Sequence, residues 1–369
     1  MTRTYDNYLV TTIKEKQYIS TIRDVETTVK PIPDCDIEGA MDPRLYKSQR
    51  KISFLMQLLP KNLFKFDYSP KSISRLRSMF NGINSTPITT TKINEYPFTA
   101  KAEDGYDIPM IRFQSDAPIK NSPILYYIHG GAFLAGSIDV IREALRTFVE
   151  KTNMIAVAID YRLAPEFPFP IGHKDCYSGF QEVVKQASSW GGNIKSIFVA
   201  GDSAGGNLAL YCSNRNLEEN KQEVCGQILL YPTVNMAGIK DQYTEFDIEK
   251  DIAIYPKQRK TILPAITVFN NLSEGLSQVL QTKELNNIYL SPYSSVSPNL
   301  PPTFISVGEH DYLSIESLAY AKKLIEVNVE TKVTFYKGMG HAYIDQIGHF
   351  PQAEDCIDDI ATFVKTHRT

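Results

Sequence analysis

The chain has 369 residues, of which 43% are hydrophobic and 22% charged, and its formal net charge at pH 7 is -3. These values are near average for a soluble globular protein and give neither a nucleic-acid partner nor a polybasic membrane attachment any electrostatic support. No segment approaches the roughly 18 apolar residues of a membrane-spanning helix, and the N-terminus is too polar for a signal peptide. Five scattered cysteines without a CxxC pair are typical of reduced thiols, so we expect a cytoplasmic protein without disulfides or a metal site.

Residues 1–90 are mostly polar and show no regular alternation of strands and helices. Helical patterns stand out at Pro43–Leu59 and Lys71–Phe80. We interpret this region as an N-terminal segment that is separate from the main sheet.

Residues 91–369 alternate between short apolar runs and helical patterns, and we expect them to form one domain. The first pair of runs, at 96–100 and 108–113, flanks a turn and predicts an antiparallel hairpin at a sheet edge. Later runs are apolar on both faces, as in the buried strands of a parallel sheet. They lie at 124–128, 154–159, 197–199, 227–231, 303–307 and 332–336. Helical patterns lie at 138–151, 175–187, 205–214, 314–327 and 352–366. This order predicts an α/β fold with a mostly parallel, doubly wound sheet, interrupted at about 235–290 by an insertion.

A glycine-rich loop with the sequence IHGGAFLAG follows the first buried strand, at Ile128–Gly136. Consecutive small residues let the backbone approach a substrate and direct N–H groups at one oxygen. We predict that the amides of Gly131 and Ala132 bind such an oxygen, whereas His129 and Gly130 support the loop. A plain glycine-rich turn is the alternative for the loop considered alone.

The segment Gly201-Asp-Ser203-Ala-Gly205 stands between a predicted strand and a predicted helix. A strand that turns directly into a helix strains its central residue, and glycines two positions away on either side relieve the crowding. We therefore predict Ser203 as a nucleophile, with the Ala204 amide at the helix N-terminus as a third oxyanion donor. The alternative is a chance match of the short pattern.

The two remaining members of a catalytic triad are expected later in the chain, first the acid and then the base. Asp311 follows the strand at 303–307, and Glu309 is the second choice. Asp311 alone would also suit the N-cap of the next helix. His341 follows the last strand in a glycine-rich loop, and His349 is its nearest rival.

These segments, together with Asp160–Pro170, resemble the bacterial hormone-sensitive-lipase-like esterases of the α/β-hydrolase fold over roughly residues 95–365. The family's HGGG-type loop ends here in Ala132, which still offers its backbone N–H. Tyr312 stands where the family's DPL motif has proline. The resemblance implies that residues 1–90 and the insertion at about 235–290 form a helical cap over the catalytic domain.

The resemblance also implies a serine carboxylesterase that hydrolyses short-chain acyl esters through an acyl-enzyme intermediate. Its partner would be a small-molecule ester, it would need no cofactor, and a homodimer is left open. Two alternatives remain. One is an amidase, carbamate or thioester hydrolase that uses the same triad. The other is a non-catalytic ligand-binding receptor, because the plant gibberellin receptors resemble this family but lack a working histidine.

Overall fold

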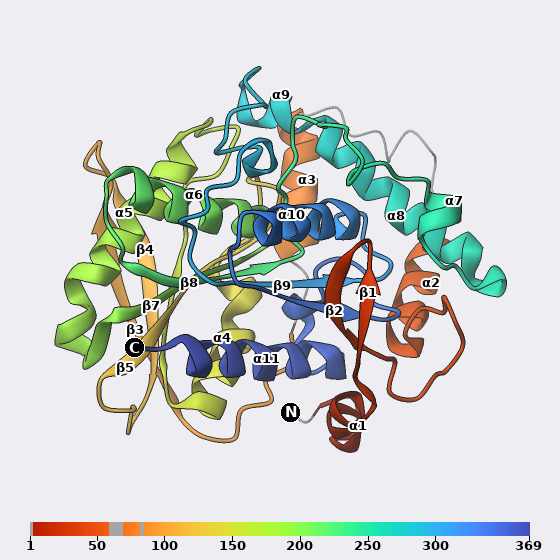
Figure 1. Cartoon of the computed structure of the whole chain (residues 1–369), viewed down its shortest axis with the longest axis horizontal. Helices are drawn as coiled ribbons and strands as arrows, with labels where there is room; N and C mark the ends of the chain where they lie inside the picture. The colour runs from red at the N-terminus through yellow and green to blue at the C-terminus, as the bar shows by residue number, and fades with distance from the viewer. Residues whose placement is uncertain (1–2, 59–68, 82–84) are drawn as a thin grey trace.

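A single ten-stranded sheet runs through the computed structural model, which describes residues 3–58, 69–81 and 85–369 (Figure 1). The strand order is β1-β2-β10-β9-β8-β7-β5-β6-β4-β3. The strands are β1 Tyr18–Ile22, β2 Val25–Lys30, β3 Ile93–Lys101, β4 Asp107–Ser115, β5 Ser122–Ile128, β6 Ile155–Ile159, β7 Gly192–Asp202, β8 Val224–Leu230, β9 Thr303–Gly308 and β10 Thr331–Tyr336.

The centre of the sheet is parallel, as the apolar runs predicted. The strands β6, β5, β7, β8, β9 and β10 pair in parallel, and β5, β6 and β9 are buried along their whole length. The predicted hairpin is also confirmed, because β3 and β4 pair antiparallel and β4 pairs antiparallel with β6. Parallel strands end at the same edge, so the loops after β5, β7, β9 and β10 lie where a ligand site is expected.

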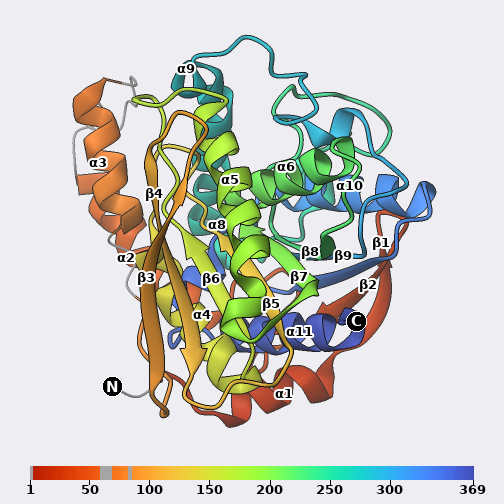
Figure 2. The same ribbon diagram turned by 90° about the vertical axis from the view of Figure 1, so that its left-hand side faces the viewer.

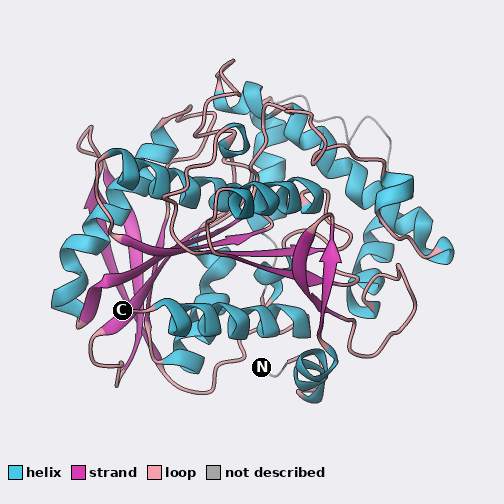
Figure 3. Ribbon diagram, in the orientation of Figure 1, coloured by secondary structure: helices cyan, strands magenta, loops and turns pink. Residues whose placement is uncertain are grey.

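Helices cover both faces of the sheet (Figure 3). In the view of Figure 1, α4 and α11 lie below the sheet, and α6 and α10 lie above it. The helix α5 packs against α6 and completes the upper layer. The bounds are α4 Ile138–Thr152, α5 Ile171–Gln186, α6 Ala204–Glu218, α10 Ser314–Glu326 and α11 Pro351–His367.

The first 30 residues differ from the sequence interpretation, which assigned all of residues 1–90 to a segment outside the sheet. Here β2 pairs in parallel with β10, and β1 pairs antiparallel with β2 at the sheet edge. The helix α1 (Tyr8–Lys16) packs against α11, and Figure 2 shows it below that helix. The reason for the difference is that polar residues occupy four of the six positions of β2, so it lacks the continuous apolar run of the central strands.

The remaining helices come from both regions that were expected to form the cap. They are α2 Pro43–Leu58, α3 Pro70–Asn81, α7 Ile248–Asp251, α8 Arg259–Glu274 and α9 Leu276–Leu280. The helix α2 packs against α8, and α8 packs against α9, so the two regions meet although about 200 residues separate them in sequence. The expected last residue of α2, Leu59, lies outside the described residues. Among the helices that the structure describes, none has the length and apolar composition to cross a bilayer.

Candidate active site

Ser203 lies in a sharp turn between β7 and α6. Its backbone has φ 54° and ψ -118°, a strained conformation for a residue with a side chain. A Cβ atom on Gly201 would lie 2.2 Å from the Gly205 carbonyl oxygen, and one on Gly205 would lie 2.1 Å from the Ile128 carbonyl oxygen. Only glycine fits at both positions, so the turn depends on the two residues that flank the serine.

A continuous chain of hydrogen bonds joins Asp311, His341 and Ser203. The Nδ1 atom of His341 is 2.8 Å from Asp311 Oδ2, and its Nε2 atom is 2.9 Å from Ser203 Oγ. The second carboxylate oxygen of Asp311 accepts the Leu313 amide at 2.9 Å, which orients the carboxylate. An imidazole with its proton on Nδ1 presents a lone pair on Nε2 to the serine hydroxyl, which is the arrangement needed for nucleophile activation.

Glu309 and His349, the alternatives to Asp311 and His341, form contacts away from Ser203. One oxygen of Glu309 pairs with Lys337 Nζ at 3.0 Å and the other accepts the Gly338 amide at 2.8 Å. The Nε2 atom of His349 lies 3.0 Å from Thr86 Oγ1. The structure therefore brings Asp311 and His341 to Ser203, and it places Glu309 and His349 in other contacts.

Two tyrosines that sequence reasoning did not assign to the site flank the His341 ring. The ring centroids of Tyr231 and Tyr312 lie 4.8 Å and 5.1 Å from that of His341. Tyr312 is the residue that departs from the DPL pattern, and that departure was the one signal in the sequence that could have pointed to it. Both rings restrict the positions that the imidazole can adopt.

The loop after β5 turns its backbone toward Ser203. Gly131 and Ala132 have φ values of 119° and 54°, and the Gly131 carbonyl accepts the amides of Leu134 and Ala135 at 3.1 Å and 2.9 Å. Gly131 and Ala132 both line the same pocket as Ser203. Ala204 is the first residue of α6, and an N–H at that position has no acceptor within its own helix.

His129 and Gly130 stabilise this loop through contacts with its backbone and with neighbouring side chains. The Nδ1 atom of His129 is 2.7 Å from the Gly130 carbonyl oxygen, and the ring stacks on Tyr161 at 4.5 Å between centroids. Burial lowers the pKa of His129, which favours the neutral ring. The Gly130 amide donates to Asp202 Oδ1 at 3.0 Å, and a Cβ atom on Gly130 would lie 2.3 Å from Asp202 Oδ2. The aspartate before the nucleophile therefore links the glycine loop to the turn at Ser203.

A small pocket of about 190 Å³ opens above Ser203. Its described apolar lining includes Phe80 of α3, Leu276 of α9 and Met236, which lies in the loop after β8. Both regions expected to form the cap therefore contribute to the pocket. The polar lining includes Thr233 and Asn235. None of the described residues that line the pocket is lysine or arginine.

Three carboxyl groups line this pocket: those of Asp202, Glu316 and Asp345. Burial raises the pKa of Asp202 to about 6, although Tyr127 and the Gly130 amide donate hydrogen bonds to it. Burial raises the pKa of Glu316 to about 7, against the effect of the Val234 amide. Burial and repulsion from Asp202 raise the pKa of Asp345 well above its usual range. Sequence reasoning missed Glu316 and Asp345, for which the only signal was their position shortly after Asp311 and His341.

Comparisons with known proteins identify the family and the fold of the chain. The model of a family described as having the alpha/beta hydrolase fold matches residues 125–345. The carboxylesterase NlhH of Mycobacterium tuberculosis is 29% identical over 239 residues, which cover 65% of this chain and 72% of the relative. An esterase of Acinetobacter venetianus is 27% identical over 240 residues, which cover 65% of this chain and 74% of the relative.

Solved structures share the fold. An ester hydrolase from the metagenome of Lake Arreo superposes with a TM-score of 0.73 at 22% identity, over 89% of this chain and 99% of that protein. An esterase of Pyrobaculum calidifontis superposes with a TM-score of 0.70 at 22% identity, over 88% of this chain and 98% of that protein.

Proposed function

Because the chain belongs to the alpha/beta hydrolase family, as a carboxylic ester hydrolase of the hormone-sensitive-lipase-like type, we propose that it hydrolyses short-chain acyl esters through Ser203, His341 and Asp311. The observation that carries this proposal is the hydrogen-bonded chain of these three side chains, with contacts of 2.8 Å and 2.9 Å. A base in contact with both a hydroxyl and a carboxylate suits acyl transfer.

In the proposed reaction, Ser203 Oγ forms a bond to the ester carbonyl carbon while its proton moves to His341 Nε2. Asp311 stabilises the imidazolium cation and keeps the ring in the required tautomer. The negative charge on the former carbonyl oxygen is held by the amides of Gly131, Ala132 and Ala204. The bond to the leaving group breaks, and His341 protonates the alcohol. Water then attacks the acyl-enzyme by the same route and releases the carboxylic acid.

The pocket supports the preference for short acyl chains. Its volume of about 190 Å³ is smaller than the roughly 300–1,000 Å³ of typical drug-sized sites. We therefore expect p-nitrophenyl esters of about two to six acyl carbons to be hydrolysed with the highest kcat/KM, because longer chains would not fit below the helices that cover the pocket. A kcat/KM that keeps rising to acyl chains of twelve carbons would contradict the proposed chain length.

The decisive test of the nucleophile is Ser203→Ala. We expect this change to lower kcat for p-nitrophenyl butyrate by about 10⁴- to 10⁶-fold, because no other group takes over the covalent step. A fluorophosphonate probe should label the unmodified enzyme at Ser203 and should not label the variant.

Ser213→Ala is a matched control, because Ser213 is a buried serine of the same helix, α6, and does not line the pocket. This variant should keep both labelling and turnover. Labelling of a residue other than Ser203, or turnover by Ser203→Ala within tenfold of the unmodified enzyme, would refute the proposed function.

A further inference from the structure

Among the carboxyl groups that line the pocket, Asp345 is the one that accepts no hydrogen bond from a described residue. It lies in a short 3-10 helix, Tyr343–Gln346, directly after His341 and Ala342, and it lines the pocket with Ser203. Only 6% of its surface is exposed, and its Oδ1 atom is buried without a hydrogen-bond partner among the described residues. A buried polar atom without a partner costs about 1–3 kcal/mol, so its presence in a ligand pocket needs an explanation.

The other two carboxyl groups of the pocket have partners. Asp202 Oδ1 accepts hydrogen bonds from the Tyr127 hydroxyl at 3.1 Å and from the Gly130 amide at 3.0 Å. Glu316 Oε1 accepts the Val234 amide at 2.7 Å. Asp202 and Glu316 therefore hold the backbone around the pocket, whereas neither carboxylate oxygen of Asp345 accepts a hydrogen bond from a described residue, and its buried Oδ1 is the one left unsatisfied.

The surroundings of Asp345 indicate which kind of group would bind there. The pocket wall carries three carboxyl groups and, among its described residues, no lysine or arginine, so it does not suit an anionic ligand. Burial and the nearby Asp202 raise the pKa of Asp345, and no lysine or arginine among the described lining residues offsets them. A hydrogen-bond donor on the ligand would supply the missing partner in either protonation state of the carboxyl group.

We propose that Asp345 is a specificity-determining residue that binds a hydroxyl or amino group of the substrate, so that the preferred esters are short esters carrying such a donor. The inference rests on the proposed esterase function and extends it from chain length to substrate chemistry. A site built to pair with a substrate hydroxyl discriminates against analogues that lack it, because the polar group then stays unpaired.

The test compares substrates that differ by one hydroxyl group. Hydrolysis of ethyl butyrate, ethyl 3-hydroxybutyrate and 2-hydroxyethyl butyrate is followed by acid release in a pH-stat. The second and third substrates carry the hydroxyl on the acyl side and on the alcohol side. In a parallel arm, 2-(dimethylamino)ethyl butyrate presents a protonated amine. For the unmodified enzyme we expect kcat/KM for at least one donor-bearing ester to exceed that for ethyl butyrate by about tenfold.

For each variant, the quantity compared is the ratio of kcat/KM for the preferred donor-bearing ester to kcat/KM for ethyl butyrate. A general loss of activity lowers both values and leaves this ratio unchanged. Asp345→Leu should reduce the ratio to less than twofold, and Asp345→Ala serves the same purpose if the leucine variant does not fold. Asp345→Asn should keep most of the preference for the hydroxylated ester, because an amide oxygen still accepts a hydrogen bond. The control Asp358→Asn removes a carboxyl group of α11 that does not line the pocket and whose ion pairs are partly exposed, and it should leave the ratio unchanged.

Two results would overturn the inference. One is an unmodified enzyme that hydrolyses ethyl butyrate as well as all the donor-bearing esters. The other is a ratio in Asp345→Leu or Asp345→Ala equal to that of the unmodified enzyme. Either result leaves the proposed function intact if ethyl butyrate hydrolysis still depends on Ser203. If the unmodified enzyme hydrolyses none of these esters, the proposed function fails as well.

Discussion

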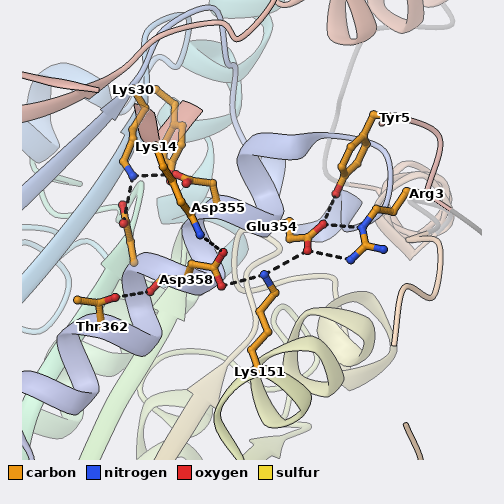
Figure 4. Close-up of polar contacts among 11 residues, drawn as sticks. Arg3, Tyr5, Lys14, Lys30, Lys151, Glu354, Asp355, Asp358 and Thr362 are labelled. Carbon is orange, nitrogen blue, oxygen red and sulfur yellow. Dashed lines mark hydrogen bonds and ion pairs between the residues drawn. The ribbon is translucent and has the colours of Figure 1, made fainter. Parts of the chain in front are cut away.

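The molecule buries acidic side chains in two regions that differ in their partners. In the pocket, Asp202, Glu316 and Asp345 lie without lysine or arginine among the described lining residues. Across the sheet, Glu354 and Asp355 of α11 contact cations, which Figure 4 shows converging on that helix. Burial alone therefore does not decide the protonation state of a carboxyl group.

The pKa values of Glu316 and Glu354 shift in opposite directions, although burial raises the pKa of Asp355 on α11 as well. Burial raises the pKa of Glu316 in the pocket to about 7. Burial acts in the same direction on Glu354, but hydrogen bonds from Arg3 and Tyr5 and the charge of Lys151 outweigh it and lower the pKa to about 2. On α11 the charges are paired and hold the structure together. In the pocket they are left uncompensated, which is typical of functional sites.

The paired cluster joins the N-terminal residues to α11. Arg3 contacts Glu354 through two nitrogens at 2.7 Å and 2.9 Å, and Tyr5 donates to the same carboxylate at 2.9 Å. Lys30 of β2 pairs with Asp355 at 2.9 Å, with both side chains almost completely buried. Residues 3–16 are therefore held against α11, which lies below the sheet in the view of Figure 1.

The largest effect on stability is expected for Lys30→Met. Removing the cation leaves Asp355 buried without its charged partner, and loss of one member of such a pair costs about 3–5 kcal/mol. The free energy of unfolding can be measured by urea titration followed by circular dichroism. Adding Asp355→Asn to the variant should recover much of the loss, because the uncompensated charge is then removed.

Lys14→Met is the matched control. Lys14 of α1 also pairs with a carboxylate of α11, Asp358, at 2.6 Å, but its side chain remains 44% exposed. An exposed pair contributes at most about 1 kcal/mol. Equal losses for Lys30→Met and Lys14→Met would show that burial of the pair is not what matters.

The next prediction concerns the contribution of Glu354 to the stability of the protein in acid. Its pKa in the folded protein, about 2, lies below the ordinary value of 4.5. The carboxylate therefore stabilises the fold above pH 4.5, and this contribution is lost as the pH falls toward 2. We expect Glu354→Gln to lower Tm at pH 6, with a difference from the unmodified protein that shrinks as the pH approaches 2.5. A difference that stays constant over this range would contradict the assignment.

The centre of the fold could be predicted from the sequence, and its N-terminal edge could not. Strands such as Ile124–Ile128 are apolar on both faces, so their burial is visible in the residues themselves. β2 is mostly polar in sequence, and its partner β10 lies about 300 residues further along the chain. Nothing local to Val25–Lys30 specifies that pairing.

The candidate site likewise contains residues that the sequence could identify and residues that it could not. Ser203, Asp311 and His341 could be found because each follows a recognisable strand and the glycines around Ser203 restrict the turn geometrically. Asp345 and Glu316 carry no such pattern, because their importance comes from burial and from the absence of nearby cations. Those are properties of the assembled pocket, and a linear sequence does not display them.

An effect smaller than that of Lys30→Met, and the sharpest test of the contrast between the two regions, is expected for Glu316→Gln. The pKa of Glu316 in the folded protein, about 7, lies above the ordinary value of 4.5. Its contribution is therefore most favourable below pH 4.5 and is lost as the pH rises through 7, the opposite direction to Glu354. The glutamine oxygen can still accept the Val234 amide, so the change removes mainly the ionisation. Between pH 5 and pH 8.5 we expect the variant to gain stability relative to the unmodified protein by about 1–3 kcal/mol, measured by urea unfolding at both pH values. A relative loss over that interval would mean that the pocket carboxyl groups are compensated like those on α11, and the contrast between the two regions would not hold.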